Sequence, residues 1–155
     1  DVRRVTDAFQ PDRDSGDLFD WEIVSDGDIA QIGNIRLSFS QTDHPVETLA
    51  MLFQCDDASI VYTSDTGRGW SLARLGHEPD IVLGEGTLIG ATDNPAIPHI
   101  SCAHLAADAN KVGAKRLVVT HVPPGSDPSK HLEEAASVFD GNVELAATGR
   151  TFSTT

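Results

Sequence analysis

The chain has 155 residues, of which 39% are hydrophobic and 23% are charged, and its formal net charge is −13. This composition is typical of a folded globular domain and excludes a disordered segment. The negative charge repels phosphate backbones and argues against a large nucleic acid as partner. No apolar run approaches the roughly 18 residues that a membrane-spanning helix needs, so we expect no association with a membrane.

The first third of the chain predicts a flexible segment followed by strands. Residues 1–18 are polar and rich in turn-forming residues, and we interpret them as flexible. Residues 21–24 predict a short strand. Two further strands, 29–32 and 35–39, flank a Gly-Asn pair that is typical of a two-residue hairpin turn. In the second of these strands, alternation predicts that Ile35, Leu37 and Phe39 point inward.

Strand and helix alternate in the remainder, with no linker that would divide two domains. Residues 49–54 and 59–63 predict a second hairpin across two aspartates. Ser101 is expected to cap a helix that Gly113 ends, and Asp127 to cap another helix with Pro128 in its first turn. The later predicted elements are a short helix at 70–75, a strand at 81–83, a loop at 86–98, a helix at 101–112, a strand at 116–120, a helix at 127–139 and a strand at 143–146.

Histidines and carboxylates stand where these elements begin or end. Each of them, taken alone, is compatible with an ordinary loop or turn residue. Together they are three histidines and two carboxylates, which are the residue types that hold zinc and similar divalent metals. Rigid strand ends are also where α/β enzymes place functional side chains. The five candidates are His44, Asp65, Glu85, His99 and His121.

The other histidines and the cysteines are interpreted as structural. His77 lies in a loop, and we expect His104 and His131 to lie on solvated helix faces. Cys55 and Cys102 are expected to be buried free thiols. Two cysteines make no disulfide framework, which fits a reducing cytoplasm.

Three motifs resemble the metallo-β-lactamase superfamily, specifically its ribonuclease Z and cyclic-nucleotide phosphodiesterase branch. Ser64-Asp65-Thr66-Gly67 resembles the turn whose aspartate bridges two metals, with serine here in place of the glycine that precedes the aspartate. Val119-Thr120-His121-Val122 and His44-Pro45-Val46 resemble the segments that give one histidine to each metal. The resemblance therefore implies that His44, Asp65 and His121 are metal ligands.

Two further motifs of the branch match in the expected order. Gly84-Glu85-Gly86-Thr87 resembles its His-Glu-Ala-Thr stretch, keeping the glutamate and lacking the histidine. His99-Ile100-Ser101 resembles the His-x-Ser/Thr sequence that opens a helix. The resemblance implies that His99, supported by Glu85, protonates the leaving group, and that Asp65 takes part in catalysis as the residue bridging the metals.

The resemblance implies an α/β fold, the C-terminal half of a four-layer αββα sandwich, with residues 1–155 as one partial domain. The branch carries an upstream His-x-His-x-Asp-His motif that is absent here. We therefore expect the chain to be part of a longer protein, or a half-domain that needs a partner. An isolated half would expose the inner face of its sheet, which favours a homodimer or pairing with the missing N-terminal half.

The implied activity is metal-dependent hydrolysis of a small phosphodiester resembling a cyclic nucleotide. Two divalent ions would activate water, with zinc the first choice and manganese or iron the alternatives. We expect this half alone to be inactive and to lack a complete metal site. The same metal pair also serves lactone or ester hydrolysis, and a non-catalytic half that binds a partner is the remaining alternative.

Overall fold

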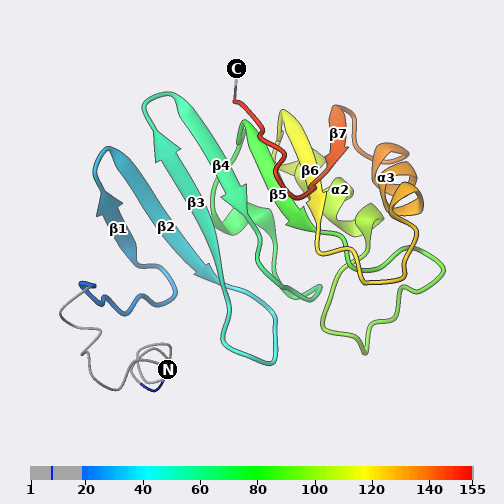
Figure 1. The fold of residues 1–155 in the computed structure, drawn as a ribbon, viewed down its shortest axis with the longest axis horizontal. Coiled ribbons are helices and arrows are strands. Elements are labelled where there is room, and N and C mark those ends of the chain that lie inside the picture. Colours follow the sequence, from blue (N-terminus) through cyan, green and yellow to red (C-terminus); the bar gives the residue numbers. More distant parts are fainter. Residues whose placement is uncertain (1–7, 9–18, 155) are drawn as a thin grey trace.

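The structure, a computed structural model, describes residue 8 and residues 19–154, so the predicted flexible segment 1–18 lies outside the described residues except at residue 8. The described part forms a seven-stranded mixed sheet whose spatial order follows the chain from β1 to β7 (Figure 1). The strands are β1 (Ile29–Ile32), β2 (Ile35–Gln41), β3 (Leu49–Cys55), β4 (Ala58–Tyr62), β5 (Ile81–Glu85), β6 (Arg116–Thr120) and β7 (Asn142–Leu145).

The first four strands are antiparallel, and both predicted hairpins are confirmed. Ile32 pairs with Ile35 across the first turn, where Gly33 has a φ of 60°. That left-handed backbone is what a two-residue turn between twisted strands requires. Cys55 pairs with Ala58 across the second turn.

The last four strands are parallel, which decides where the site forms. β4 pairs with β5, β5 with β6, and β6 with β7, all in parallel register. The carboxyl ends of these strands therefore meet at one edge of the sheet. Glu85, the last residue of β5, pairs with Thr120, the last residue of β6.

The helices confirm the predicted caps. In α2 (Cys102–Lys111) the Ser101 side chain accepts a hydrogen bond from the backbone of His104, and in α3 (Pro128–Ala136) Asp127 accepts one from Ser129. α3 ends at Ala136, three residues before the predicted end. The predicted helix at 70–75 is a single 3₁₀ turn, η2 (Leu72–Arg74). None of the helices among the described residues is long and apolar enough to cross a membrane.

The predicted strand at 21–24 is wrong. These residues form no regular structure, and Ile23 is 93% exposed. Within the described residues the sheet ends at β1, and no strand there pairs with this segment to supply a hydrogen-bonded ladder. The inward alternation predicted for β2 holds for Leu37 and Phe39, which are buried, but not for Ile35, which lies beside the turn and is 37% exposed.

One face of the sheet packs against the two helices (Figure 1). Val82, Leu117 and Val119 contribute this face, and all three are completely buried. Leu105 and Ala109 of α2 belong to the same core. Gly84 is required beneath the helix, because a Cβ at this position would lie 2.4 Å from a methyl carbon of Leu105.

Two predictions about single side chains are corrected. His131 is 1% exposed, not solvated: its Nδ1 lies 2.7 Å from the Gly86 carbonyl oxygen and its Nε2 lies 3.2 Å from Ser126 Oγ. Cys102 is buried as expected, and burial raises the pKa of its thiol to about 12, so it is unreactive near neutral pH. Cys55 is free but only partly buried, because it lies at the end of β3 beside a turn.

Among the described residues, the C-terminal tail, residues 146–154, covers part of the opposite face of the sheet and crosses in front of β5 and β6 in Figure 1. The Arg116 guanidinium lies 5.5 Å from the ring centroid of Phe152 and donates a hydrogen bond to the Ser153 carbonyl oxygen. Beyond the tail this face bears an apolar hollow of about 290 Å³. Its lining residues are Ile35, Phe53, Gln54, Cys55, Ala58, Ile60 and Thr154.

Candidate metal and catalytic site

The five predicted site residues gather at the carboxyl edge of the parallel strands. Asp65 follows β4, Glu85 ends β5 and His121 follows β6. His44 lies in the loop between β2 and β3, and His99 lies just before α2. The ring of His99 stands between the other two imidazoles, with centroid distances of 5.5 Å to His44 and 5.2 Å to His121. The structure thus brings together residues that are up to 77 positions apart, from His44 to His121.

Two residues of the site turns have a left-handed backbone. Ser64, just before Asp65, has a φ of 52°, and His121 has a φ of 60°. Such values are uncommon for residues other than glycine and cost of order 1–3 kcal/mol. Ser64 stands where the resembled motif has glycine, and its hydroxyl donates a 2.7 Å hydrogen bond to the Leu49 carbonyl oxygen. The chain therefore keeps the sharp turn while using a residue that is strained in it.

Hydrogen bonds tie the His44 loop to the Asp65 turn. Thr42 Oγ1 donates to the Asp65 carbonyl oxygen at 2.7 Å, and the Gly69 backbone donates to Asp43 Oδ2 at 2.7 Å. A Cβ on Gly67 would lie 2.6 Å from Asp43 Oδ2, so only glycine fits there without displacement. Two segments that carry predicted ligands are thereby held in one arrangement.

Glu85 is the centre of the buried side of the site, at 1% exposure. One carboxylate oxygen accepts a hydrogen bond from the Thr66 backbone and the other accepts one from the Thr87 hydroxyl. His99 Nδ1 lies 3.1 Å from each oxygen. Because a carboxylate only accepts, His99 donates Nδ1–H to Glu85. This is the geometry that a supporting role for Glu85 requires.

Ligand atoms of Glu85, His99 and His121 all lie within 4.8 Å of one another, which is close enough for a shared metal ion. The carboxylate of Glu85 is already engaged by three donors. We therefore interpret Glu85 as an acceptor that orients the histidines, and not as an open metal ligand.

All three site histidines use Nδ1 to contact the protein. His44 Nδ1 lies 3.3 Å from the Val46 carbonyl oxygen, His99 Nδ1 contacts Glu85, and His121 Nδ1 lies 2.9 Å from the Thr87 hydroxyl. The Glu85 carboxylate fixes the proton of His99 on Nδ1, so Nε2 of His99 keeps its lone pair, and the longer contact with the Val46 carbonyl oxygen favours the same tautomer in His44. A neutral imidazole with a free nitrogen lone pair is what a divalent metal binds, and the orienting partners are those expected around a metal site. The donor set therefore fits a metal.

Asp65 supplies a carboxylate beside these rings. Its Oδ1 lies 3.4 Å from His121 Nδ1, and the two side chains are 38% and 44% exposed. An exposed carboxylate next to a histidine can accept a metal without first losing buried hydrogen bonds. Asp65 and His121 thus form the accessible side of the site, and Glu85 the buried side.

Sequence reasoning missed the partners that hold these residues. Thr87 is the last residue of the Gly84-Glu85-Gly86-Thr87 motif, and its hydroxyl joins Glu85 to His121. Asp43 directly precedes the predicted ligand His44, and this position is the only feature of the sequence that points to a role for Asp43. Arg68 pairs with Asp93, linking the turn after Asp65 to the loop that precedes α2. No local pattern in the sequence indicates that pair.

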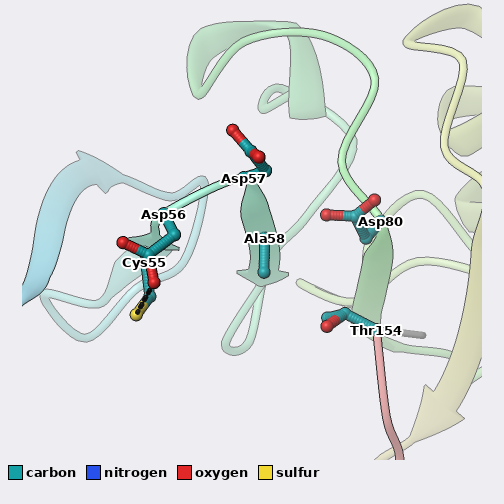
Figure 2. A pocket seen from close by; sticks show the side chains of 6 residues that line it. All are labelled: Cys55, Asp56, Asp57, Ala58, Asp80 and Thr154. Atoms are coloured by element: carbon teal, nitrogen blue, oxygen red, sulfur yellow. Dashed lines mark hydrogen bonds between the residues drawn. The ribbon is translucent and has the colours of Figure 1, made fainter.

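A separate hollow of about 390 Å³ lies at the opposite edge of the sheet, near the start of β4 (Figure 2). Figure 2 shows three carboxylates lining it, from Asp56, Asp57 and Asp80. Lys115 Nζ lies 2.7 Å from Asp80, and this ammonium group holds the pKa of that carboxyl below its usual value. The ion pair with Lys115 accounts for Asp80 as a structural residue, and the candidate site remains at the carboxyl edge.

The chain is similar in sequence to several known proteins. No family model matches the chain. An uncharacterised protein of Mycobacterium leprae is 29% identical over 140 residues, covering 90% of this chain and 49% of the relative. The probable metallo-hydrolase YhfI of Bacillus subtilis is 27% identical over 117 residues, covering 76% and 48%. Ribonuclease Z of Myxococcus xanthus is 31% identical over 96 residues, covering 59% and 31%. The chain thus spans about half the length, or less, of the curated relatives it matches.

The fold agrees with these relatives. The crystal structure of YhfI, a metallo-β-lactamase fold protein, superposes with a TM-score of 0.77 at 25% identity, covering 82% of this chain and 53% of YhfI. The predicted α/β fold class is thereby confirmed, and so is the resemblance inferred from the motifs. The chain belongs to the metallo-β-lactamase superfamily.

Proposed function

We propose that this chain is the C-terminal part of a metal-dependent hydrolase that cleaves a small phosphodiester. The observation that carries the proposal is the set of histidines at the sheet edge, each with its Nδ1 against a protein oxygen. We assign His44, Asp65 and His121 as metal ligands. The ligands that complete the site would come from an upstream half with a His-x-His-x-Asp-His motif.

The residues divide the chemistry between them. Bound divalent metals polarise the phosphoryl group and supply a nucleophilic water at neutral pH. Asp65, which is exposed and lies 3.4 Å from His121 Nδ1, would be the carboxylate that holds metal beside the histidines. The tie between Thr42 and the Asp65 carbonyl oxygen keeps that carboxylate near the His44 loop.

His99 moves a proton at the leaving oxygen. Glu85 accepts Nδ1–H of His99 and, as a buried carboxylate, stabilises the imidazolium that can donate a proton from Nε2. A positioned acid of this kind contributes about 10²- to 10⁴-fold to a rate. Its removal therefore affects turnover and leaves the metal ligands in place.

The net charge of the chain supports a small substrate. A net charge of −13 disfavours a long polyanion, although ribonuclease Z is among the relatives. Lactone or ester hydrolysis uses the same residues, and parallel assays with bis(p-nitrophenyl) phosphate and a p-nitrophenyl ester distinguish the two classes.

The uncovered sheet face is the surface that we propose pairs with the upstream half or with a second copy of the chain. Ile32 is 66% exposed beside Ile35, and the apolar hollow continues between Phe53 and Ile60. Exposed apolar area of this kind is stabilised by a partner. Sedimentation of the chain alone tests the second copy. If the chain is a monomer, and Ile35→Glu does not change this, the upstream half remains as the proposed partner of this face.

The site test uses His121→Ala, with His104→Ala as the control on α2. We expect His121→Ala to weaken zinc binding and phosphodiester hydrolysis by more than the roughly 10- to 100-fold typical of outer-shell changes. His99→Ala should lower the rate while zinc is retained. Unchanged activity in His121→Ala, or loss of zinc in His99→Ala, would overturn the corresponding assignment. The assays use the chain alone and the chain joined to its upstream half.

A further inference from the structure

The Thr87 hydroxyl lies between two residues of the site. It hydrogen-bonds Glu85 Oε2, and its oxygen lies 2.9 Å from His121 Nδ1. Because the carboxylate can only accept, the hydroxyl proton goes to Glu85 and the hydroxyl oxygen accepts Nδ1–H from His121. We propose that Thr87 is a positioning residue that holds His121 in the tautomer whose Nε2 is free to bind a metal.

This tautomer needs a partner to hold it. In a free neutral imidazole the proton favours Nε2, which would block the nitrogen that we assign to the metal. The inference rests on the proposed function for the role of His121 as ligand, but the tautomer itself is a property of this chain. Through Thr87, the buried carboxylate of Glu85 orients His121, whose Nδ1 is 3.9 Å away, as well as His99, which it contacts directly.

Asp65 is the competing acceptor, with its Oδ1 3.4 Å from the same nitrogen. That distance exceeds the usual range for an N–H···O hydrogen bond, while the Thr87 contact falls within it. Thr87 is also tied to a carboxylate that is 1% exposed, whereas the Asp65 side chain is 38% exposed to solvent. The geometry therefore favours Thr87 as the residue that fixes the proton.

The experiment measures ¹⁵N chemical shifts of the His121 ring in the metal-free chain at alkaline pH. Thr87→Val keeps the shape and removes the hydroxyl, Thr87→Ser keeps the hydroxyl, and Asp65→Ala removes the competing acceptor. Thr92→Val, in the neighbouring loop, is the matched control. We expect Thr87→Val to shift the tautomer ratio toward Nε2–H by about three- to tenfold, as for the loss of one net hydrogen bond.

Thr87→Ser, Thr92→Val and Asp65→Ala should keep the native ratio. A native ratio in Thr87→Val, or a shift in Asp65→Ala or Thr87→Ser as large as that of Thr87→Val, overturns the inference. Titration with cobalt(II), followed by visible absorption, tests the metal role separately. We expect Thr87→Val to lose about 10- to 100-fold in cobalt affinity and Thr87→Ser to recover it. A tautomer shift with unchanged cobalt affinity would support the positioning of His121 and count against His121 as a metal ligand.

Discussion

Replacing Ser64 with glycine and with alanine tests whether the turn before Asp65 is strained. Both substitutions lose the hydrogen bond from Ser64 to the Leu49 carbonyl oxygen, worth about 0.5–1.5 kcal/mol. Only glycine relieves the left-handed backbone at φ 52°, which costs a residue with a Cβ about 1–2 kcal/mol. Part of this gain in stability is lost, because glycine also makes the unfolded chain more flexible and so stabilises the unfolded state. We therefore expect Ser64→Gly to be more stable than Ser64→Ala by about 1 kcal/mol.

Ser137 is the matched control for this prediction. Its hydroxyl also donates a 2.7 Å hydrogen bond to a backbone carbonyl oxygen, that of Glu134, but its φ is −73°. At such a position glycine is less stable than alanine by about 0.5–1 kcal/mol. Urea unfolding of the four variants gives the free energies of unfolding. If glycine and alanine differ with the same sign at Ser64 and at Ser137, the reasoning about strain is refuted.

Two other predictions concern packing and charge. Gly67→Ala should lower the free energy of unfolding by about 1–3 kcal/mol, because the added Cβ meets Asp43 at 2.6 Å. Gly90→Ala, whose Cβ would lie 3.5 Å from Glu134, should be close to neutral, and equal losses in the two variants would contradict the packing argument. Lys115→Met removes the cation that lowers the pKa of Asp80. A pKa that is lowered in the folded state stabilises the fold above the ordinary aspartate pKa of about 3.9, and this stability is lost as the pH falls through the pKa of Asp80 in the folded state. The free energies of the native chain and Lys115→Met should therefore converge at strongly acid pH, and a constant gap would contradict the assignment.

Local signals account for the parts of the fold that the sequence predicts well. Ser101 and Asp127 are polar caps directly before apolar helical repeats, and both helices begin where these residues indicate. β6 runs from Arg116 to Thr120, as predicted, because a short β-branched run is bounded by turns. The segment at 21–24 has a similar local pattern, but none of the strands that the structure describes pairs with it. Strand formation there depends on long-range pairing, which the segment itself does not encode.

The candidate site, too, can be predicted from the sequence only in part. The strand-end positions of Asp65, Glu85 and His121 follow from the chain order, since parallel strands bring their carboxyl ends together. The sequence also contains a signal for the burial of His131, because this residue lies four residues before the buried Ala135 on the same helix face. The choice of nitrogen in each histidine depends on acceptors from distant segments, and only the folded arrangement supplies these.

The order of the sheet, in which each strand lies beside the one that precedes it in the chain, bears on how the protein folds. Every new strand docks on an edge that its predecessor has just completed, so no early strand has to wait for a distant one. Loop closure is cheapest for the antiparallel pairs, whose strands are joined by short connections, and costs more for the parallel pairs, whose connections are longer. Growth can begin at the β2–β3 hairpin and extend toward β7 as the chain leaves the ribosome. The strand ends that carry the candidate site would then be completed in order, with the histidine after β6 among the last groups to arrive.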